Sequence, residues 1–202
     1  METPRYPEHA IADPRARAVL DRLRAADQAQ RAAGLPVAQR TRNITAATGR
    51  FLYAIARATG ARRIFEMGSS NGYSTIWLAL AARETGGRVT GSEVLAERAT
   101  EAARNLAEAG LAQVAEVRVG DAAALATDLS EPLDLVFIDA EKDDYARLFL
   151  AVVDHVRSGG LILTDNVVSH DCAAFQALVR SRDDVLTLTV PLERGIEFTV
   201  KR

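Results

Sequence analysis

The sequence is poor in cysteine and in long apolar runs. Its 202 residues include one cysteine, Cys172, so an internal disulfide cannot form and the chain suits a reducing compartment. No apolar run approaches the length of a membrane span, and the first residues do not resemble a secretory signal. We therefore expect a cytoplasmic protein with no membrane partner.

A strong net charge is also missing. The formal net charge of -2 gives no reason to propose a nucleic-acid partner. The charge is uneven, however, because residues 1–63 hold twelve arginines against five acidic residues, whereas residues 64–202 hold thirteen basic residues against twenty-two acidic ones. This pattern favours a basic helical arm that packs on an acidic body, of the same chain or of a symmetry mate. Alternatively, some of these arginines contact an anionic substrate.

Lysine is scarce, because only Lys142 and Lys201 occur among 25 basic residues. Arginine stays protonated in proteins, whereas the pKa of a lysine can be lowered enough for it to accept a proton. Lys142 follows Asp139 by three residues and is therefore a candidate for proton transfer.

Apolar strand-like runs alternate with helical patterns from residue 63 onward. The patterns predict strands over 63–67, 88–93, 114–119, 133–138 and 160–165, and helices over 73–85, 95–109, 121–129, 143–156 and 171–182. This alternation is typical of an α/β fold, a doubly wound sheet with helices on both faces. Two further stretches, 184–191 and 195–201, have no helix between them, so the C-terminal strand should be antiparallel in a mostly parallel sheet.

We expect one domain over 1–202. A helical N-terminal extension, 1–60, contains a helix over 14–33 and a second one capped by Thr45 or Thr48. The α/β core, 61–202, follows it.

The first strand of the core ends in a glycine turn. Glycines stand at 68 and 72, but the G-x-G-x-x-G fingerprint of dinucleotide sites is missing, and Glu66 would repel a pyrophosphate. A nicotinamide-dependent dehydrogenase is therefore disfavoured. Glu93, which ends the second strand, can accept both hydroxyls of a ribose. Together these features describe a nucleoside joined to a cationic group, and S-adenosylmethionine has that chemistry.

Five motifs strengthen this interpretation. They are EMGSSNGYSTIWLA from residue 66, GSE ending at Glu93, GDA at 120–122, FIDAEKDDY at 137–145 and LILTDN at 161–166. In this order and spacing the sequence resembles the metal-dependent class I S-adenosylmethionine O-methyltransferases, the family of catechol and caffeoyl-CoA O-methyltransferases and their bacterial relatives, over roughly 40–202. The resemblance implies a Rossmann-like fold and a homodimer.

The resemblance also assigns residues to the methyl donor. The turn from Gly68 to Ser74, which includes Ser69, holds the methionine part of the donor, and Glu66 lies behind it. Glu93 binds the ribose, and Asp121-Ala122 flank the adenine. The Asn43-Ile44 loop covers the donor, and Asp139 also contributes to this site. From the residues alone, Glu66 and Asp121 are equally candidates for helix capping.

Three oxygen-bearing residues follow buried strands: Asp139, Asp165 and Asn166. Because the ends of adjacent strands lie close together, these side chains can converge on Mg²⁺ or another hard divalent cation. Taken singly, each is also explained as a loop or cap residue.

The resemblance makes Lys142 the general base, which removes a proton from a cation-bound vicinal diol. The alternative is a solvated lysine on a helix end. His170 matches a position near the substrate in the family, or else is a surface histidine.

We therefore expect an O-methyltransferase that acts on a small aromatic vicinal diol, catechol-like, with a divalent cation and a lysine base. The main alternative is an S-adenosylmethionine-binding homologue with little turnover. Selectivity for the acceptor should come from the N-terminal arm, the loop after Asn166 and the turn at 192–195.

Overall fold

The computed structural model describes residues 11–202. Residues 1–10, the start of the expected N-terminal extension, lie outside the described part. The helices are α1 (Pro14–Ala32), α2 (Ala46–Ala58), α3 (Tyr73–Thr85), α4 (Ala96–Glu108), α5 (Ala122–Thr127), α6 (Tyr145–Val152) and α7 (Ala173–Arg180), with short 3-10 turns η2 (Val37–Gln39), η3 (Lys142–Asp144) and η4 (Val153–His155). The strands are β1 (Arg63–Met67), β2 (Arg88–Glu93), β3 (Ala115–Val119), β4 (Leu133–Ile138), β5 (Val156–Thr164), β6 (Val185–Val190) and β7 (Ile196–Lys201).

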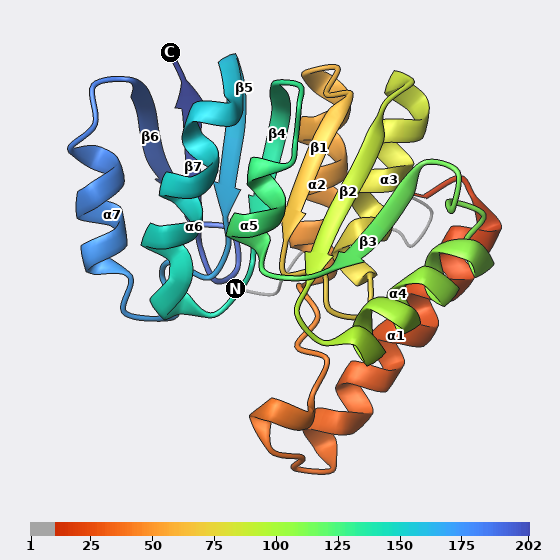
Figure 1. Ribbon diagram of the computed structural model, residues 1–202. Coiled ribbons are helices and arrows are strands. Elements are labelled where there is room, and N and C mark those ends of the chain that lie inside the picture. The colour runs from red at the N-terminus through yellow and green to blue at the C-terminus, as the bar shows by residue number, and fades with distance from the viewer. Residues whose placement is uncertain (1–10) are drawn as a thin grey trace.

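The strands form one seven-stranded sheet in the order β3-β2-β1-β4-β5-β7-β6 (Figure 1). Strands β1 to β5 pair in parallel, and β7 runs antiparallel to both β5 and β6. The expected fold class, with its antiparallel C-terminal strand, is confirmed. The chain reverses its direction of winding between β1 and β4, and the carboxyl ends beside such a switch point form the usual ligand crevice of this fold class.

Helices cover both faces of the sheet, as the continuous apolar strands predict. One buried cluster joins residues of α1, α2, α3 and α4 to the sheet, and a second joins α5, α6 and α7 to the opposite face. Strand β1 serves both clusters, because Ile64 faces the first and Phe65 and Met67 face the second. Successive side chains on a strand alternate in direction, so Glu66 points to the same side as Ile64 and is buried under α3.

The expected boundary between the helix over 143–156 and the strand over 160–165 is wrong. Helix α6 ends at Val152, and β5 already begins at Val156, which pairs with Leu133. The pairing register then shifts before Leu135, and Gly160 sits where a Cβ would meet the Val156 side chain at 2.6 Å. After Val156, the first residues of β5 are polar residues and glycines, which lack the apolar pattern of a strand. For this reason the sequence pattern did not indicate the true start of β5.

The N-terminal arm packs on its own chain. Asp13 caps α1 through the N–H groups of Arg15 and Ala16, and Arg22 donates to Glu108 of α4 at 2.6 Å. Thr45 caps α2 by accepting from the Thr48 N–H at 3.1 Å. Within residues 11–202, no helix is both long and apolar enough to cross a membrane.

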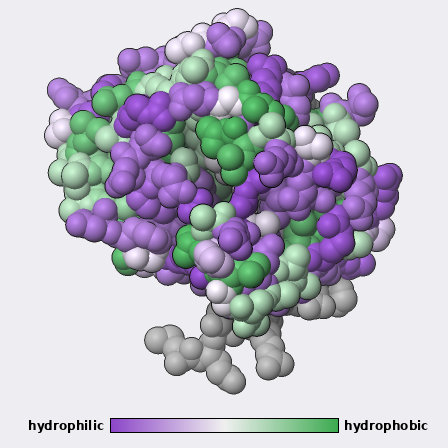
Figure 2. Space-filling model, turned by 60° about the horizontal axis from the view of Figure 1, so that its bottom comes forward, coloured by the Kyte–Doolittle hydropathy of each residue, from purple (hydrophilic) through white to green (hydrophobic). Residues whose placement is uncertain are grey.

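The loop after α1 returns toward α2 below the carboxyl ends of the parallel strands (Figure 1). Figure 2 turns this edge forward and shows a hollow in the surface, bordered by hydrophilic residues with some hydrophobic ones between them. The candidate site lies at this edge.

Candidate functional site

A cavity of about 540 Å³ opens at the carboxyl edge of the sheet. One end, named here the Glu93 end, is bordered by the turn after β1 and by the residues that follow β2 and β3. The other, the Asp139 end, is bordered by the residues that follow β4 and β5. The cavity is therefore long enough to bring groups from five strand ends to one elongated ligand or to two adjacent ones.

The glycine turn lies between the two ends. Gly68 has a φ of 94°, and a Cβ there would meet the backbone oxygen of Asp139 at 2.5 Å, so the turn after β1 rests directly on the end of β4. Ser69 and Ser74 are buried and border the cavity, as predicted for the donor turn. This close backbone approach requires a residue without a side chain at position 68.

Glu66 lies behind the turn and does not border the cavity. Its carboxylate accepts hydrogen bonds from Ser69 Oγ at 2.6 Å and from Thr75 Oγ1, while its Oε1 atom has no partner. Burial raises the pKa of Glu66, and the hydroxyl groups around it oppose that effect. In the structure Glu66 holds the turn to α3; its predicted contact with a donor stays a prediction.

Glu93 lies at the end of β2, on the wall of the Glu93 end of the cavity. Its Oε2 accepts from the Ser70 N–H at 2.9 Å and its Oε1 from the Leu95 N–H at 2.9 Å. A carboxylate has about four acceptor positions, so each oxygen keeps one for a further donor. Glu93 is thus oriented by backbone groups and still able to bind hydroxyls.

Asp121 and Ala122 border the same end, as expected. Asp121 also caps α5 by accepting from the Ala124 N–H at 3.0 Å, and it pairs with Arg147 at 2.8 Å. The Arg147 guanidinium holds the pKa of Asp121 below its usual value. The capping role is therefore present, and the carboxylate lies at the cavity wall as well.

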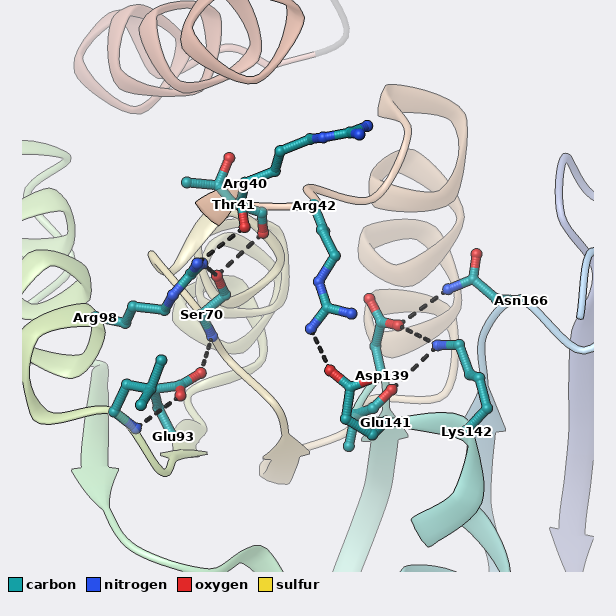
Figure 3. Close-up of polar contacts among 12 residues, drawn as sticks. Arg40, Thr41, Arg42, Ser70, Glu93, Arg98, Asp139, Glu141, Lys142 and Asn166 are labelled. Carbon is teal, nitrogen blue, oxygen red and sulfur yellow. Dashed lines mark hydrogen bonds and ion pairs between the residues drawn. The ribbon is translucent and has the colours of Figure 1, made fainter. Parts of the chain in front are cut away.

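The loop over 36–45 covers the cavity, and two arginines hold it there (Figure 3). Arg98 of α4 donates to the backbone oxygen of Arg40 at 2.9 Å and to Ser70 Oγ at 2.8 Å. Arg42, with a positive φ of 53°, crosses toward Glu141 and pairs with it at 2.5 Å. Ile44 and Asn43 border the cavity from this loop, in agreement with their predicted covering position.

At the Asp139 end, Lys142 is surrounded by acceptors. Its Nζ donates to Asp139 Oδ1 at 3.2 Å, to the Ala140 backbone oxygen at 3.1 Å and to the Tyr145 hydroxyl. The Tyr145 hydroxyl donates in turn to the Asp165 backbone oxygen at 2.8 Å. Lys142 is therefore held at the cavity wall with its side chain 20% exposed, unlike a solvated lysine on a helix end.

The three predicted cation ligands come together here, because β4 and β5 are neighbours. Asn166 Nδ2 donates to Asp139 Oδ1 at 3.0 Å (Figure 3), while Oδ1 of Asn166 and Oδ1 of Asp165 are buried without a partner. Burial and the neighbouring Asp139 carboxylate raise the pKa of Asp165 to about 7. Asn166 also has a φ of 63°, a left-handed conformation that few non-glycine residues adopt and in which asparagine is enriched.

These features suit a hard cation. Unpartnered buried oxygens and two close carboxylates are a cost that a divalent ion would offset, and all the donor atoms are oxygens. Within residues 11–202, no three His, Cys, Asp or Glu side chains gather as a metal-binding group, and Asn166 is the residue that could add an amide oxygen to the two carboxylates. In the structure the Asn166 amide directs its nitrogen toward Asp139. Rotation of the amide group by 180° would exchange the positions of its nitrogen and oxygen.

Some residues of the site were missed by the sequence analysis. Arg98 and Arg42 act through contacts with residues 28 to 99 positions away, which no local pattern signals. Tyr145 could have been found, because it follows Lys142 by three residues in a helical segment and so shares its face. His170 is exposed at the edge of the cavity, where its Nδ1 lies 2.9 Å from Ser169 Oγ.

Known proteins share this sequence and fold. A sequence model of the O-methyltransferase family matches residues 15–186. The catechol O-methyltransferase of Mycobacterium tuberculosis is 41% identical over 126 residues, which are 62% of this chain and 57% of that protein. The catechol O-methyltransferase of Niastella koreensis is 36% identical over 152 residues, which are 73% of this chain and 66% of that protein. The alignments thus span less than two thirds of the length of these two relatives.

Solved structures of O-methyltransferases share the fold of this chain. An O-methyltransferase from Bacillus cereus, in complex with SAH, is 29% identical with a TM-score of 0.77, and the superposition covers 92% of this chain and 91% of that one. The O-methyltransferase TomG from Streptomyces achromogenes, in complex with SAM, is 32% identical with a TM-score of 0.74, and 89% and 88% of the two chains are covered. Since the family match spans most of the chain and the fold is shared, the chain belongs to the O-methyltransferase family.

Proposed function

We propose that the protein transfers a methyl group from S-adenosylmethionine to one hydroxyl of a small aromatic vicinal diol, with help from a divalent cation and with Lys142 as the base. One observation carries the proposal. A single cavity has an oriented ribose-type acceptor, Glu93, at one end, and a lysine beside a cluster of oxygen ligands at the other.

The Glu93 end suits the methyl donor. In this proposal the Glu93 carboxylate would bind the ribose hydroxyls, the turn at 68–74 would hold the methionine part, and the loop over 36–45 would cover the donor. A donor that lies across the carboxyl end of β1, from Glu93 toward β4, would place its sulfonium near Asp139. The sulfonium supplies an already activated methyl group, so the protein needs mainly to align the acceptor oxygen with it.

The Asp139 end suits the acceptor. Asp139, Asp165 and Asn166 would hold the cation, which when bound lowers the pKa of a neighbouring hydroxyl. Lys142, fixed by Asp139, Ala140 and Tyr145, would take the proton from the hydroxyl that is methylated. Tyr145 then keeps the amine aimed at the cavity, because its own hydroxyl is tied to the Asp165 backbone.

Labelled S-adenosylmethionine tests the proposal with catechols, hydroxycinnamates and flavonoids, with Mg²⁺ or with a chelator. We expect methylation of vicinal diols that the chelator abolishes. Asp139→Ala should remove the Mg²⁺-dependent turnover, whereas Asp143→Asn, a change of an exposed carboxylate four residues on, should leave it unchanged. Donor binding without turnover on any diol would instead identify a homologue that only binds S-adenosylmethionine.

A further inference from the structure

Arginine borders the cavity at six positions, and one of them differs from the rest. Five of these arginines donate hydrogen bonds to other residues of the protein: Arg31, Arg40, Arg42, Arg98 and Arg147. Arg194 is partly buried, and among residues 11–202 its guanidinium makes no hydrogen bond or ion pair; its charge reaches the Asp165 carboxyl group only at longer range, where it opposes the rise of that pKa. A partly buried guanidinium that faces a cavity with no hydrogen-bonded anion is costly, and a bound anionic ligand would offset that cost.

The backbone of Arg194 is firmly placed. The N–H groups of Val168 and Ser169 donate to its oxygen at 2.9 and 3.2 Å, so the turn between β6 and β7 is joined to the loop after Asn166. Gly195 has a φ of 83°, and a Cβ there would meet the Val168 side chain at 2.3 Å. The turn therefore presents the Arg194 side chain from a fixed position.

That position is at the acceptor end of the cavity. The turn leads into β7, which pairs with β5, whereas Glu93 ends β2, four strands away in the sheet order. With about 4.8 Å between neighbouring strands, the two ends are separated by roughly 19 Å. Arg194 thus lies beyond the reach of the ribose part of the donor and on the same side as His170 and Asn166.

We infer that Arg194 determines specificity by binding a carboxylate on the ring of the acceptor diol; this inference rests on the proposed function. A guanidinium offers a planar fork that matches a carboxylate with two parallel hydrogen bonds. Lys142 and the divalent ion would face the hydroxyls. The Arg194 guanidinium then remains available to a substituent farther along the ring. An uncharged diol leaves it unpaired, so the site favours the anionic acceptor.

The test compares 3,4-dihydroxybenzoate with its methyl ester, which keeps an electron-withdrawing carbonyl but lacks the charge. In the parent we expect a lower KM for the acid than for the ester. Arg194→Gln should raise KM for the acid about tenfold or more and leave KM for the ester within about twofold. Arg194→Lys keeps the charge without the fork and should fall between. Arg88→Gln, an exposed arginine at the opposite edge of the sheet, is the control and should change neither value.

Calorimetry with S-adenosylhomocysteine and Mg²⁺ gives a readout that needs no turnover. The acid should bind the parent more tightly than the ester does, and Arg194→Gln should remove the difference. Equal affinity for acid and ester in both proteins would overturn the inference while methylation of either compound still supports the proposed function. Failure to methylate or bind any diol would overturn both.

Discussion

At the scale of single residues, Lys142 is distinguished by its partners more than by its position in the sequence. Its scarcity and its spacing from Asp139 made it a candidate. The hydrogen bonds to Asp139, Ala140 and Tyr145 show that the amine is fixed at the cavity wall. The contact with Tyr145 depends on the turn η3, which places Lys142 directly before α6. The helix expected over 143–156 did not predict this turn.

We expect Lys142→Ala to lower kcat by about 10²- to 10⁴-fold, the usual range for loss of a general base. The Kd for S-adenosylhomocysteine should stay nearly unchanged, because the residues proposed to bind the donor, Glu93 and the glycine turn, lie at the other end of the cavity. The only other lysine, Lys201, pairs with Asp184 in the terminal strands and offers a matched control through Lys201→Ala. A Lys142→Ala variant as active as the parent at every pH would disprove the role.

Glu66 gives a second prediction, on stability and pH. Because burial raises the pKa of Glu66, the folded chain holds a proton there that the unfolded chain has released. Its contribution to stability is complete below the ordinary glutamate pKa of 4.5 and is lost as the pH rises through the raised value. As the pH rises above 4.5, keeping this buried carboxyl group, whose Oε1 has no partner, in the folded chain therefore costs stability.

We expect Glu66→Gln to raise Tm near pH 8 by about 2–4 °C, the shift that corresponds to about 1 kcal/mol in a chain of this length. The gain should disappear as the pH approaches 4.5, so thermal unfolding followed across this range is the measurement. Glu116→Gln, at an exposed position, should have no comparable effect. A lower Tm for Glu66→Gln at pH 8 would show that the carboxylate is stabilised by contacts beyond its two hydroxyl donors.

At the scale of elements, the prediction from sequence was best where the pattern was strongest. The bounds of β1, α3, β2 and β4 agree with those expected, since a glycine or polar residue stands at or directly after the end of each. The start of β5 was missed because its pairing shifts register at a glycine. The site follows the same division: strand-end residues were predictable, whereas the loop over 36–45 is placed by contacts that only the folded chain creates.

This loop leads to a prediction about donor binding. Arg98 joins the loop to the glycine turn through Arg40 and Ser70, so its removal should loosen the cover without touching the Asp139 end. We expect Arg98→Gln to weaken S-adenosylhomocysteine binding roughly three- to tenfold by calorimetry, the effect of losing one or two hydrogen bonds. Hydrogen exchange should rise in residues 38–43.

Arg104→Gln provides the control, because Arg104 is an exposed arginine of the same helix. Unchanged affinity and unchanged exchange in Arg98→Gln would mean that the other contacts of the loop, such as Arg42 with Glu141 and Asn43 with Asp27, hold it without Arg98.

At the scale of the whole molecule, one part of the sheet keeps an apolar surface. Leu186 and Leu188 on the edge strand β6 are 55% and 51% exposed. They lie opposite Val200 and Phe198 of β7, so the four side chains share a face. Phe51 of α2 contacts Phe198 edge to face, and the two leucines beside it stay exposed. An exposed apolar strip on an edge strand is a typical surface for association.

We therefore propose that the expected homodimer forms through this strip rather than through the basic arm, which packs on its own chain by Arg22 and Glu108. A two-fold axis beside β6 would bring the strip of each protomer against the other and cover the leucines of both.

Leu188→Lys places a charge in that contact, and light scattering after size-exclusion chromatography should then give half the mass of the parent. Leu150→Lys changes a leucine that is 48% exposed on α6, outside the strip, and should keep the dimer. A monomeric parent, or a dimer that Leu150→Lys separates and Leu188→Lys does not, would contradict this account, since the strip would then have no second copy to cover it.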